Sequence, residues 1–349
     1  MIYTTFMKKE LIQAAWYIAC QSKDLKQKPL KIMILDQPLV LFRNQNKKAS
    51  ALLDRCPHRN APLSKGWVRS GELVCPYHGW RFSNEGHCTQ IPGRSHQKHS
   101  KAHDTPFYTT HESHGLIWIY AKSNQIPTEP PYALPEIATK SYRTMILENE
   151  LSTSLHRLAE NFLDGTHTHF VHNGLIRKEQ VRKETQVKVV RTSHQVEAQY
   201  INEETLSGLI VKLLAPGSQR IDAFGRFLIP GIAQLEYRTD REYKLFISAC
   251  ITPISENKIK VFSVMSFRWG LPNILGEWLA RPLFYWAIKQ DKKIMIDQAK
   301  TIADFEKESF VSTELDLLGP HIIWLLNRHA KNKPPPADHK LEKKITLWL

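Results

Sequence analysis

Short apolar stretches separated by turn residues predict strands over much of the first third of the chain. From about residue 30 to 122, segments such as "KIMILD", "PLVLFRN", "ELVCP" and "GLIWIYA" are rich in β-branched and aromatic residues and are bounded by Asn, Gly and Pro. We therefore predict a small all-β unit in the N-terminal part of the chain.

The later part of the chain mixes two periodicities. Residues 155–176 and 275–308 have the spacing of helices, whereas 184–268 alternates apolar and polar positions as half-buried strands do. Strands flanked by long helices are typical of an α+β domain, in which an antiparallel sheet packs on helices. The predicted fold class is therefore α+β.

A proline-rich segment suggests where the two domains meet. Residues 124–135, "NQIPTEPPYALP", show almost no periodicity and are expected to form a linker. A chain of 349 residues is also long for one core. We predict domains at 1–125 and 136–328, and we expect the charged, proline-containing residues 329–349 to form a mobile extension.

Amino-acid composition indicates which kinds of binding partner and which cellular compartment to expect for this protein. The net charge of +14 is spread along the chain, which favours an acidic protein partner over nucleic acid. Five cysteines form no dense framework, so we expect a reducing, cytoplasmic location. No apolar run is long enough to predict an integral membrane segment, since 271–288 is interrupted by charges and a proline.

Two short loops combine cysteine and histidine. "CPHRN" contains Cys56 and His58, and "CPYHGW" contains Cys75 and His78. A structural zinc site is one interpretation, because zinc binds Cys2His2 sets. Zinc fingers, however, place their histidines together on a helix, whereas here each loop supplies one of each. That pattern suits a Rieske 2Fe–2S cluster, in which two cysteines bind one iron and two histidines bind the other.

A second group of polar residues lies about a hundred residues later, in "ENFLDGTHTHFVH". His167 and His172 are five residues apart, which places them about 140° from each other on a straight helix. A break near Gly165 would let both imidazoles reach one metal. Asp164 is a further ligand candidate, and His169 is an alternative to one of the two histidines.

A mononuclear iron site would need a carboxylate as well as two histidines. Three aspartates of the 275–308 helix compete for this role. Asp291 interrupts the apolar face, whereas Asp297 and Asp304 have lysines at helical spacing. A carboxylate on a buried face is costly unless it is paired or bound to a metal, so we select Asp291.

These motifs together resemble the catalytic α subunit of Rieske non-haem iron oxygenases, in the branch of vanillate O-demethylase, dicamba O-demethylase and pheophorbide a oxygenase. The resemblance implies a Rieske domain followed by a helix-grip catalytic domain. It implies that His167, His172 and Asp291 bind Fe(II), and that Asn161 lies near the iron. Asp164 matches an aspartate that links the iron site to a cluster histidine of a neighbouring subunit, here His78, in a homotrimer.

The activity implied by the resemblance is oxygenation with O2. Electrons would come from NAD(P)H through a ferredoxin or flavin reductase, and the substrate would be a hydrophobic ring compound that is hydroxylated or oxidatively demethylated. Ring cis-dihydroxylation is the alternative reaction. An electron carrier without oxygenase chemistry is the alternative class of protein, although such a carrier would not need the residues that follow the first domain.

Overall fold

A computed structural model describes residues 11–94, 100–134, 137, 142–180, 183–204, 209, 220–240, 244–268 and 273–348. The chain divides into two compact units. One comprises Gln13–Ala133, and the other comprises Leu134–Leu349 with Met1–Ile12.

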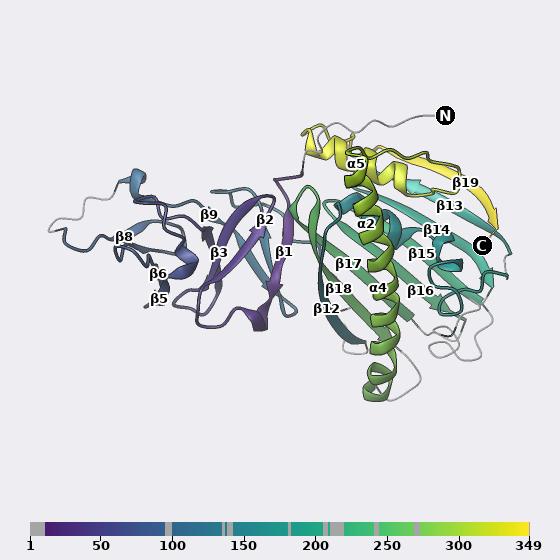
Figure 1. The fold of residues 1–349 in the computed structure, drawn as a ribbon, viewed down its shortest axis with the longest axis horizontal. Coiled ribbons are helices and arrows are strands. Elements are labelled where there is room, and N and C mark those ends of the chain that lie inside the picture. The colour runs from purple at the N-terminus through teal and green to yellow at the C-terminus, as the bar shows by residue number, and fades with distance from the viewer. Residues whose placement is uncertain are drawn as a thin grey trace. The chain divides into compact units, whose positions relative to one another are not determined.

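The first unit is built of short antiparallel strands, as predicted (Figure 1). Its three sheets have the strand orders β1-β11-β10, β2-β3-β4-β9 and β5-β6-β7-β8. The strands are β1 (Trp16–Gln21), β2 (Leu30–Ile34), β3 (Gln37–Arg43), β4 (Ala49–Leu53), β5 (Trp67–Arg69), β6 (Glu72–Val74), β7 (Arg81–Phe82), β8 (Cys88–Gln90), β9 (Phe107–Tyr108), β10 (Thr110–Ser113) and β11 (Leu116–Tyr120). Three short 3-10 turns accompany them, η1 (Ser22–Asp24), η2 (Leu63–Lys65) and η3 (Lys101–His103).

The core of this unit reaches both Cys/His loops. Val40 and Phe42 of β3 pack with Leu52 of β4, and the side chains of Cys56 and Cys75 belong to the same buried cluster. Because burial of apolar side chains supplies most of the stabilisation of a small domain, the loops are fixed to the part that holds the domain together.

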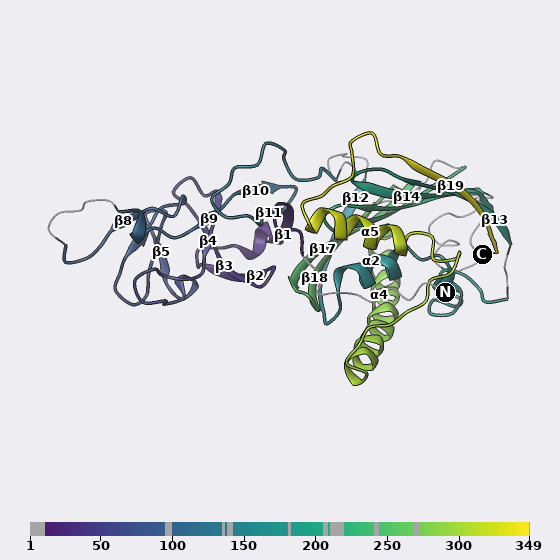
Figure 2. The same ribbon diagram turned by 90° about the horizontal axis from the view of Figure 1, so that it is seen from above.

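The second unit is an eight-stranded antiparallel sheet with helices across one face (Figures 1 and 2). The strand order is β12-β18-β17-β16-β15-β14-β13-β19. The strands are β12 (Arg143–Leu151), β13 (Glu184–Arg191), β14 (Gln195–Glu204), β15 (Arg220–Leu228), β16 (Ile232–Thr239), β17 (Lys244–Ser255), β18 (Lys258–Arg268) and β19 (Leu341–Trp348). The helices are α2 (Leu155–Leu163), the 3-10 turn η4 (Thr166–His169), α4 (Asn273–Asp304) and α5 (Gly319–Ala330). The α+β fold class is thus confirmed.

Alternation along the strands explains how the sheet faces the helices. Val187 and Val189 of β13 and Val196 and Ala198 of β14 are buried in one cluster with Leu158 of α2. Successive side chains of a strand point to opposite faces. Apolar residues at every second position therefore produce one continuous apolar face. The helices cover part of that face and leave the rest as the wall of a cavity.

The expectation of a mobile C-terminal extension is wrong. Strand β19 pairs with β13 in antiparallel register from Glu184↔Trp348 to Arg191↔Leu341, and Leu347 is 2% exposed. The proline run that indicated mobility only connects α5 to this strand. The two lysines within "LEKKITLW" masked the apolar alternation. Lys344 lies on the outer face, whereas Lys343 is exposed although it shares the face of Ile345 and Leu347.

We predict that Leu347→Ala lowers the free energy of unfolding by about 2–4 kcal/mol, the range of a buried leucine truncation. Trp348→Ala is the matched control, since Trp348 is the next residue of β19 and is 66% exposed. Urea unfolding followed by circular dichroism measures both. Equal stability of the two variants would mean that β19 does not pack on the core.

Candidate functional site

The two Cys/His loops share one backbone pattern. The Asn60 N–H donates to the Cys56 carbonyl at 2.9 Å, and the Gly79 N–H donates to the Cys75 carbonyl at 3.1 Å. Asn60 and Gly79 both have positive φ, 59° and 71°, a conformation that glycine and asparagine tolerate best. Each loop is therefore a tight turn that begins at a buried cysteine.

The turns bring like side chains together. The Cys56 and Cys75 thiols are both buried and are neighbours, and the His58 and His78 rings have centroids 4.5 Å apart. The His58 ring stacks on Trp80, with an angle of 5° between the ring planes. The loops thus present a pair of sulfurs and a pair of imidazoles, as the spacing predicts.

The donor set fits a 2Fe–2S cluster. His58 Nδ1 is buried and has no hydrogen-bond partner, which is costly for a polar atom unless a ligand meets it. Burial raises the pKa of the Cys56 thiol to about 11, and the adjacent Cys75 adds to the increase. A thiolate is therefore unfavourable at this position without a bound metal to stabilise it.

In the second unit, helix α2 ends where the site begins. Asp164 is its C-terminal cap, and the Asp164 carboxylate accepts hydrogen bonds from the N–H groups of Thr166 and His167 at 2.7 and 3.1 Å. A second set of hydrogen bonds holds the same turn. Arg177 Nη1 donates to the Gly165 carbonyl and to Thr168 Oγ1, both at 2.9 Å. The predicted helix over 155–176 is therefore shorter, because these bonds hold η4 in a separate turn.

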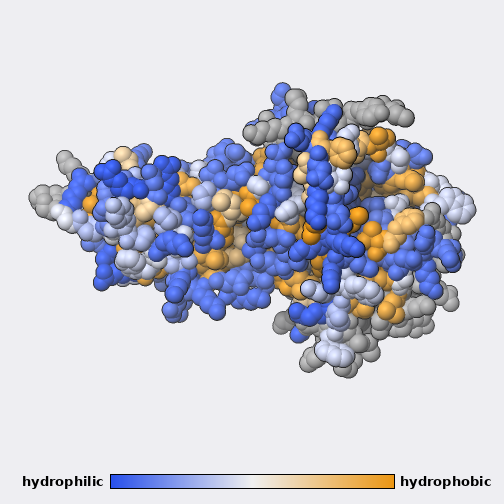
Figure 3. Space-filling view, viewed as in Figure 1, coloured by the Kyte–Doolittle hydropathy of each residue, from blue (hydrophilic) through white to orange (hydrophobic). Residues whose placement is uncertain are grey.

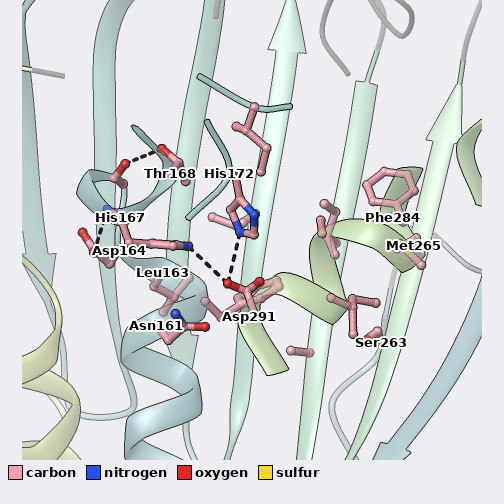
Figure 4. A pocket seen from close by; sticks show the side chains of 18 of the residues that line it. Asn161, Leu163, Asp164, His167, Thr168, His172, Ser263, Met265, Phe284 and Asp291 are labelled. Atoms are coloured by element: carbon pink, nitrogen blue, oxygen red, sulfur yellow. Dashed lines mark hydrogen bonds and ion pairs between the residues drawn. The ribbon is translucent and has the colours of Figure 1, made fainter. Parts of the chain in front are cut away.

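This turn and helix α4 bring three side chains to one point (Figure 4). Asp291 Oδ1 lies 3.5 Å from His167 Nε2 and 3.1 Å from His172 Nε2. One ligand atom from each residue lies within 4.8 Å of the others. On a straight helix His167 and His172 would point about 140° apart. The break after α2 lets both imidazoles face Asp291.

The alternative residues lie elsewhere. The imidazole of His169 is buried, and its Nδ1 is 3.0 Å from the Lys178 carbonyl. Asp297 is exposed and lies 3.9 Å from Lys300, and Asp304 is exposed at the end of α4. None of the three joins the group formed by His167, His172 and Asp291.

The arrangement fits a divalent metal. Asp291 Oδ1 is buried and makes no hydrogen bond, although two imidazole nitrogens face it. Burial favours the neutral form of each carboxyl, yet the neighbouring histidines hold the pKa of Asp164 and of Asp291 below the usual value. Burial by itself would lower the pKa of His167, but the carboxylates of Asp164 and Asp291 raise it to about 9. A cation is therefore favoured here, and a metal would replace the proton.

Two residues that sequence reasoning missed hold the site in place. The Nδ1–H of His172 donates to Gln290 Oε1 at 2.8 Å, which leaves the lone pair of Nε2 directed toward Asp291. The other residue is Arg177, described above. No sequence pattern singles out either residue, apart from the position of Gln290 next to Asp291.

A largely apolar cavity of about 200 Å³ opens onto these three side chains. Asn161 lines it, and its Oδ1 is buried without a hydrogen-bond partner. The apolar part of the wall comes from the sheet and from α4, and it includes Leu151, Ala223, Leu235, Ile247, Val261, Met265 and Phe284. Figure 4 shows Met265, Phe284 and Ser263 to one side of Asp291 and the two histidines.

Comparisons with known proteins agree with the two-unit architecture. Residues 15–105 match the model of the Rieske [2Fe-2S] domain, and residues 151–332 match the model of the vanillate O-demethylase oxygenase C-terminal domain. The oxygenase component of dicamba O-demethylase from Stenotrophomonas maltophilia is 28% identical over 305 residues, which covers 81% of this chain and 87% of that protein. The vanillate O-demethylase oxygenase subunit of Pseudomonas sp. is 31% identical over 48% of this chain and 47% of its own length.

Solved structures have the same fold. Dicamba monooxygenase bound to 3,6-dichlorosalicylic acid superposes with a TM-score of 0.77 at 23% identity, over 95% of this chain and 99% of that one. NdmA of Pseudomonas putida CBB5 with caffeine gives 0.76 at 21% identity, over 92% of both chains.

The expectations of a Rieske cluster, a non-haem iron and an oxygenase activity are confirmed by these matches. The names of these relatives favour hydroxylation or demethylation over cis-dihydroxylation. This chain belongs to the Rieske non-haem iron oxygenases, in the branch that contains vanillate O-demethylase and dicamba O-demethylase.

Proposed function

We propose that Cys56, His58, Cys75 and His78 hold the 2Fe–2S cluster, and that His167, His172 and Asp291 hold the mononuclear iron. The observation that carries this proposal is the buried Asp291 oxygen, which has two imidazole nitrogens beside it and no hydrogen bond. Two histidines and one carboxylate are the ligand set of non-haem iron oxygenases, which leave coordination positions open.

The chain's own residues bind and orient the substrate. When bound, the iron supplies the activation of O2 that adds one oxygen atom to a C–H bond. The wall of the cavity is mostly apolar, so it favours a hydrophobic ring compound and excludes water from the reacting carbon. Asn161 directs an unpaired amide oxygen into this space, where it can orient a polar group near the iron.

Electrons reach the protein from outside. Rieske oxygenase components receive electrons from a ferredoxin or a reductase, and the net charge of +14 favours an acidic donor. Free thiols at all five cysteines support a cytoplasmic location. In the part of the chain that the structure describes, no helix has the length and apolar character needed to cross a bilayer.

We place the route between the two metal sites at Asp164, within a homotrimer. Asp164 Oδ2 lies 3.5 Å from His167 Nδ1, on the opposite side of that ring from Asp291. Its side chain is 30% exposed and borders a second hollow, which also contains Arg157, Thr166 and Leu317. His78 and Tyr77 are exposed at the tip of their loop. These two surfaces are suited to meet between neighbouring subunits.

The first test removes one proposed iron ligand. His167→Ala should retain the visible absorption of the cluster but lower substrate-dependent O2 uptake by more than about 100-fold, because the iron loses a ligand. Uptake is measured with a generic reductase, NADH and a panel of ring compounds. His194→Ala, which removes an exposed histidine of the same unit, should be unaffected. Turnover retained in His167→Ala would remove the iron assignment.

The second test concerns the route of the electron. Asp164→Asn keeps an acceptor for the Thr166 N–H but removes the charge beside His167, so we expect reoxidation of the reduced cluster to slow by about tenfold or more. Stopped-flow absorbance in a single turnover measures this rate. Asp316→Asn alters a carboxylate of the same hollow and serves as the control. An unchanged rate in Asp164→Asn would refute the route.

The third test concerns the residue that orients His172. Gln290→Leu should weaken Co(II) binding by about 10–100-fold, since the imidazole loses the acceptor that fixes its tautomer. Gln290→Glu keeps an acceptor and should retain most of the affinity. Gln298→Leu, on the exposed side of α4, is the control. Calorimetric titration of metal-free protein measures all three variants, and identical affinities would contradict a positioning role.

A further inference from the structure

Helix α4 presents two different faces. On one side, Phe284, Ala287, Ile288 and Met295 line the cavity together with Asp291. On the other side, three large aromatic side chains face outward. Trp278 is 75% exposed, Tyr285 is 65% exposed and Trp286 is 51% exposed. Residues seven or eight apart lie two turns from each other, so the three form one outer aromatic cluster.

Cations extend this outer face toward the middle of the helix. Lys289 and Lys293 follow the aromatic cluster at helical spacing, and both are exposed. Among the side chains described from Trp278 to Ile296, Asp291 is the only acidic one, and it borders the cavity. The outer face of this half of α4 is therefore aromatic and positively charged.

The helix is placed so that this face can reach a surface. In Figure 1 the N-terminal end of α4 extends below the strands of the sheet. In the space-filling view of Figure 3, the upper part of α4 is deep blue, which marks hydrophilic residues. The lower part of the helix is paler, which marks residues of intermediate hydropathy such as Trp and Tyr. An exposed group of large aromatic side chains on a water-soluble unit normally marks a contact surface.

We propose that the outer face of α4 from Trp278 to Lys293 docks on an anionic lipid bilayer surface. Tryptophan and tyrosine are enriched at the interface between lipid headgroups and water, and lysines beside them attract anionic headgroups. A second copy of this chain is the rival occupant of this face. The hollow at Asp164, where a neighbouring subunit would bind, is bordered instead by Ile294 and Gln298 of α4.

Docking would place the bilayer close to the cavity. The stretch of α4 that carries Tyr285 and Trp286 outside carries Phe284 and Ala287 on the cavity side. A hydrophobic ring compound dissolved in the bilayer would then enter without crossing much water, a consequence that rests on the proposed function. The docking itself does not depend on catalysis.

The test uses the full-length protein with its metals and vesicles of equal parts phosphatidylglycerol and phosphatidylcholine. Wild type should sediment with these vesicles and much less with phosphatidylcholine alone. Trp278→Ser/Trp286→Ser and Lys289→Glu/Lys293→Glu should each lower the partition coefficient by about tenfold or more. Trp67→Ser, which removes a half-exposed tryptophan of the first unit, should bind as wild type does.

Light scattering of the same samples separates the proposal from its rivals. The variants should keep the wild-type mass, and a fall in mass for Trp278→Ser/Trp286→Ser would show that the face lies between copies and would overturn the proposal. Wild type that stays in the supernatant, or a loss of binding in Trp67→Ser equal to that of the double variants, would also overturn it. His167→Ala should sediment as wild type does, because vesicle binding does not depend on the iron site. The vesicle experiment therefore tests the docking even if the iron assignment fails.

Discussion

The contact between the Asp291 carboxylate and two imidazoles is the constraint on which the second unit depends. A buried carboxylate oxygen without a hydrogen bond is destabilising unless a cation lies beside it, and here His167 and His172 point their Nε2 atoms at that oxygen. The two histidines could not both do so from one straight helix, on which they would lie about 140° apart. The turn stabilised by Asp164 and Arg177 therefore determines the geometry of the whole site.

The two units bring their candidate metal ligands together in different ways. In the first, paired turns on a rigid β core place Cys56 and Cys75 inside and His58 and His78 nearer the surface, where an electron donor can approach. In the second, the side chains of the proposed iron site come from distant segments and lie beside an apolar cavity. The first group is accessible to an electron donor, and the second is sheltered beside the cavity for substrate. These positions match the two roles of this family, which are electron entry and substrate oxidation.

Residue type and spacing predicted most of the side chains that converge at the candidate site, because residue types that bind metals are few. Cys56 and Cys75 with their histidines are recognisable within short loops, and Asp291 is recognisable because it interrupts an apolar helical face. Gln290 and Arg177 could not be predicted, since a glutamine or an arginine has many ordinary roles and only the folded contacts reveal its partner. Strand β19 was missed because strand pairing is non-local, and nothing near residue 341 indicates that β13 has an edge to cover.

The most direct test of the central claim is the metal and sulfide content of anaerobically reconstituted protein, compared between wild type and Asp291→Ala. Wild type should hold about three iron and two labile sulfide per chain, from one 2Fe–2S cluster and one mononuclear iron. Asp291→Ala should retain the sulfide and lose close to one iron. Zinc in place of iron, or equal iron in the two proteins, would contradict the account.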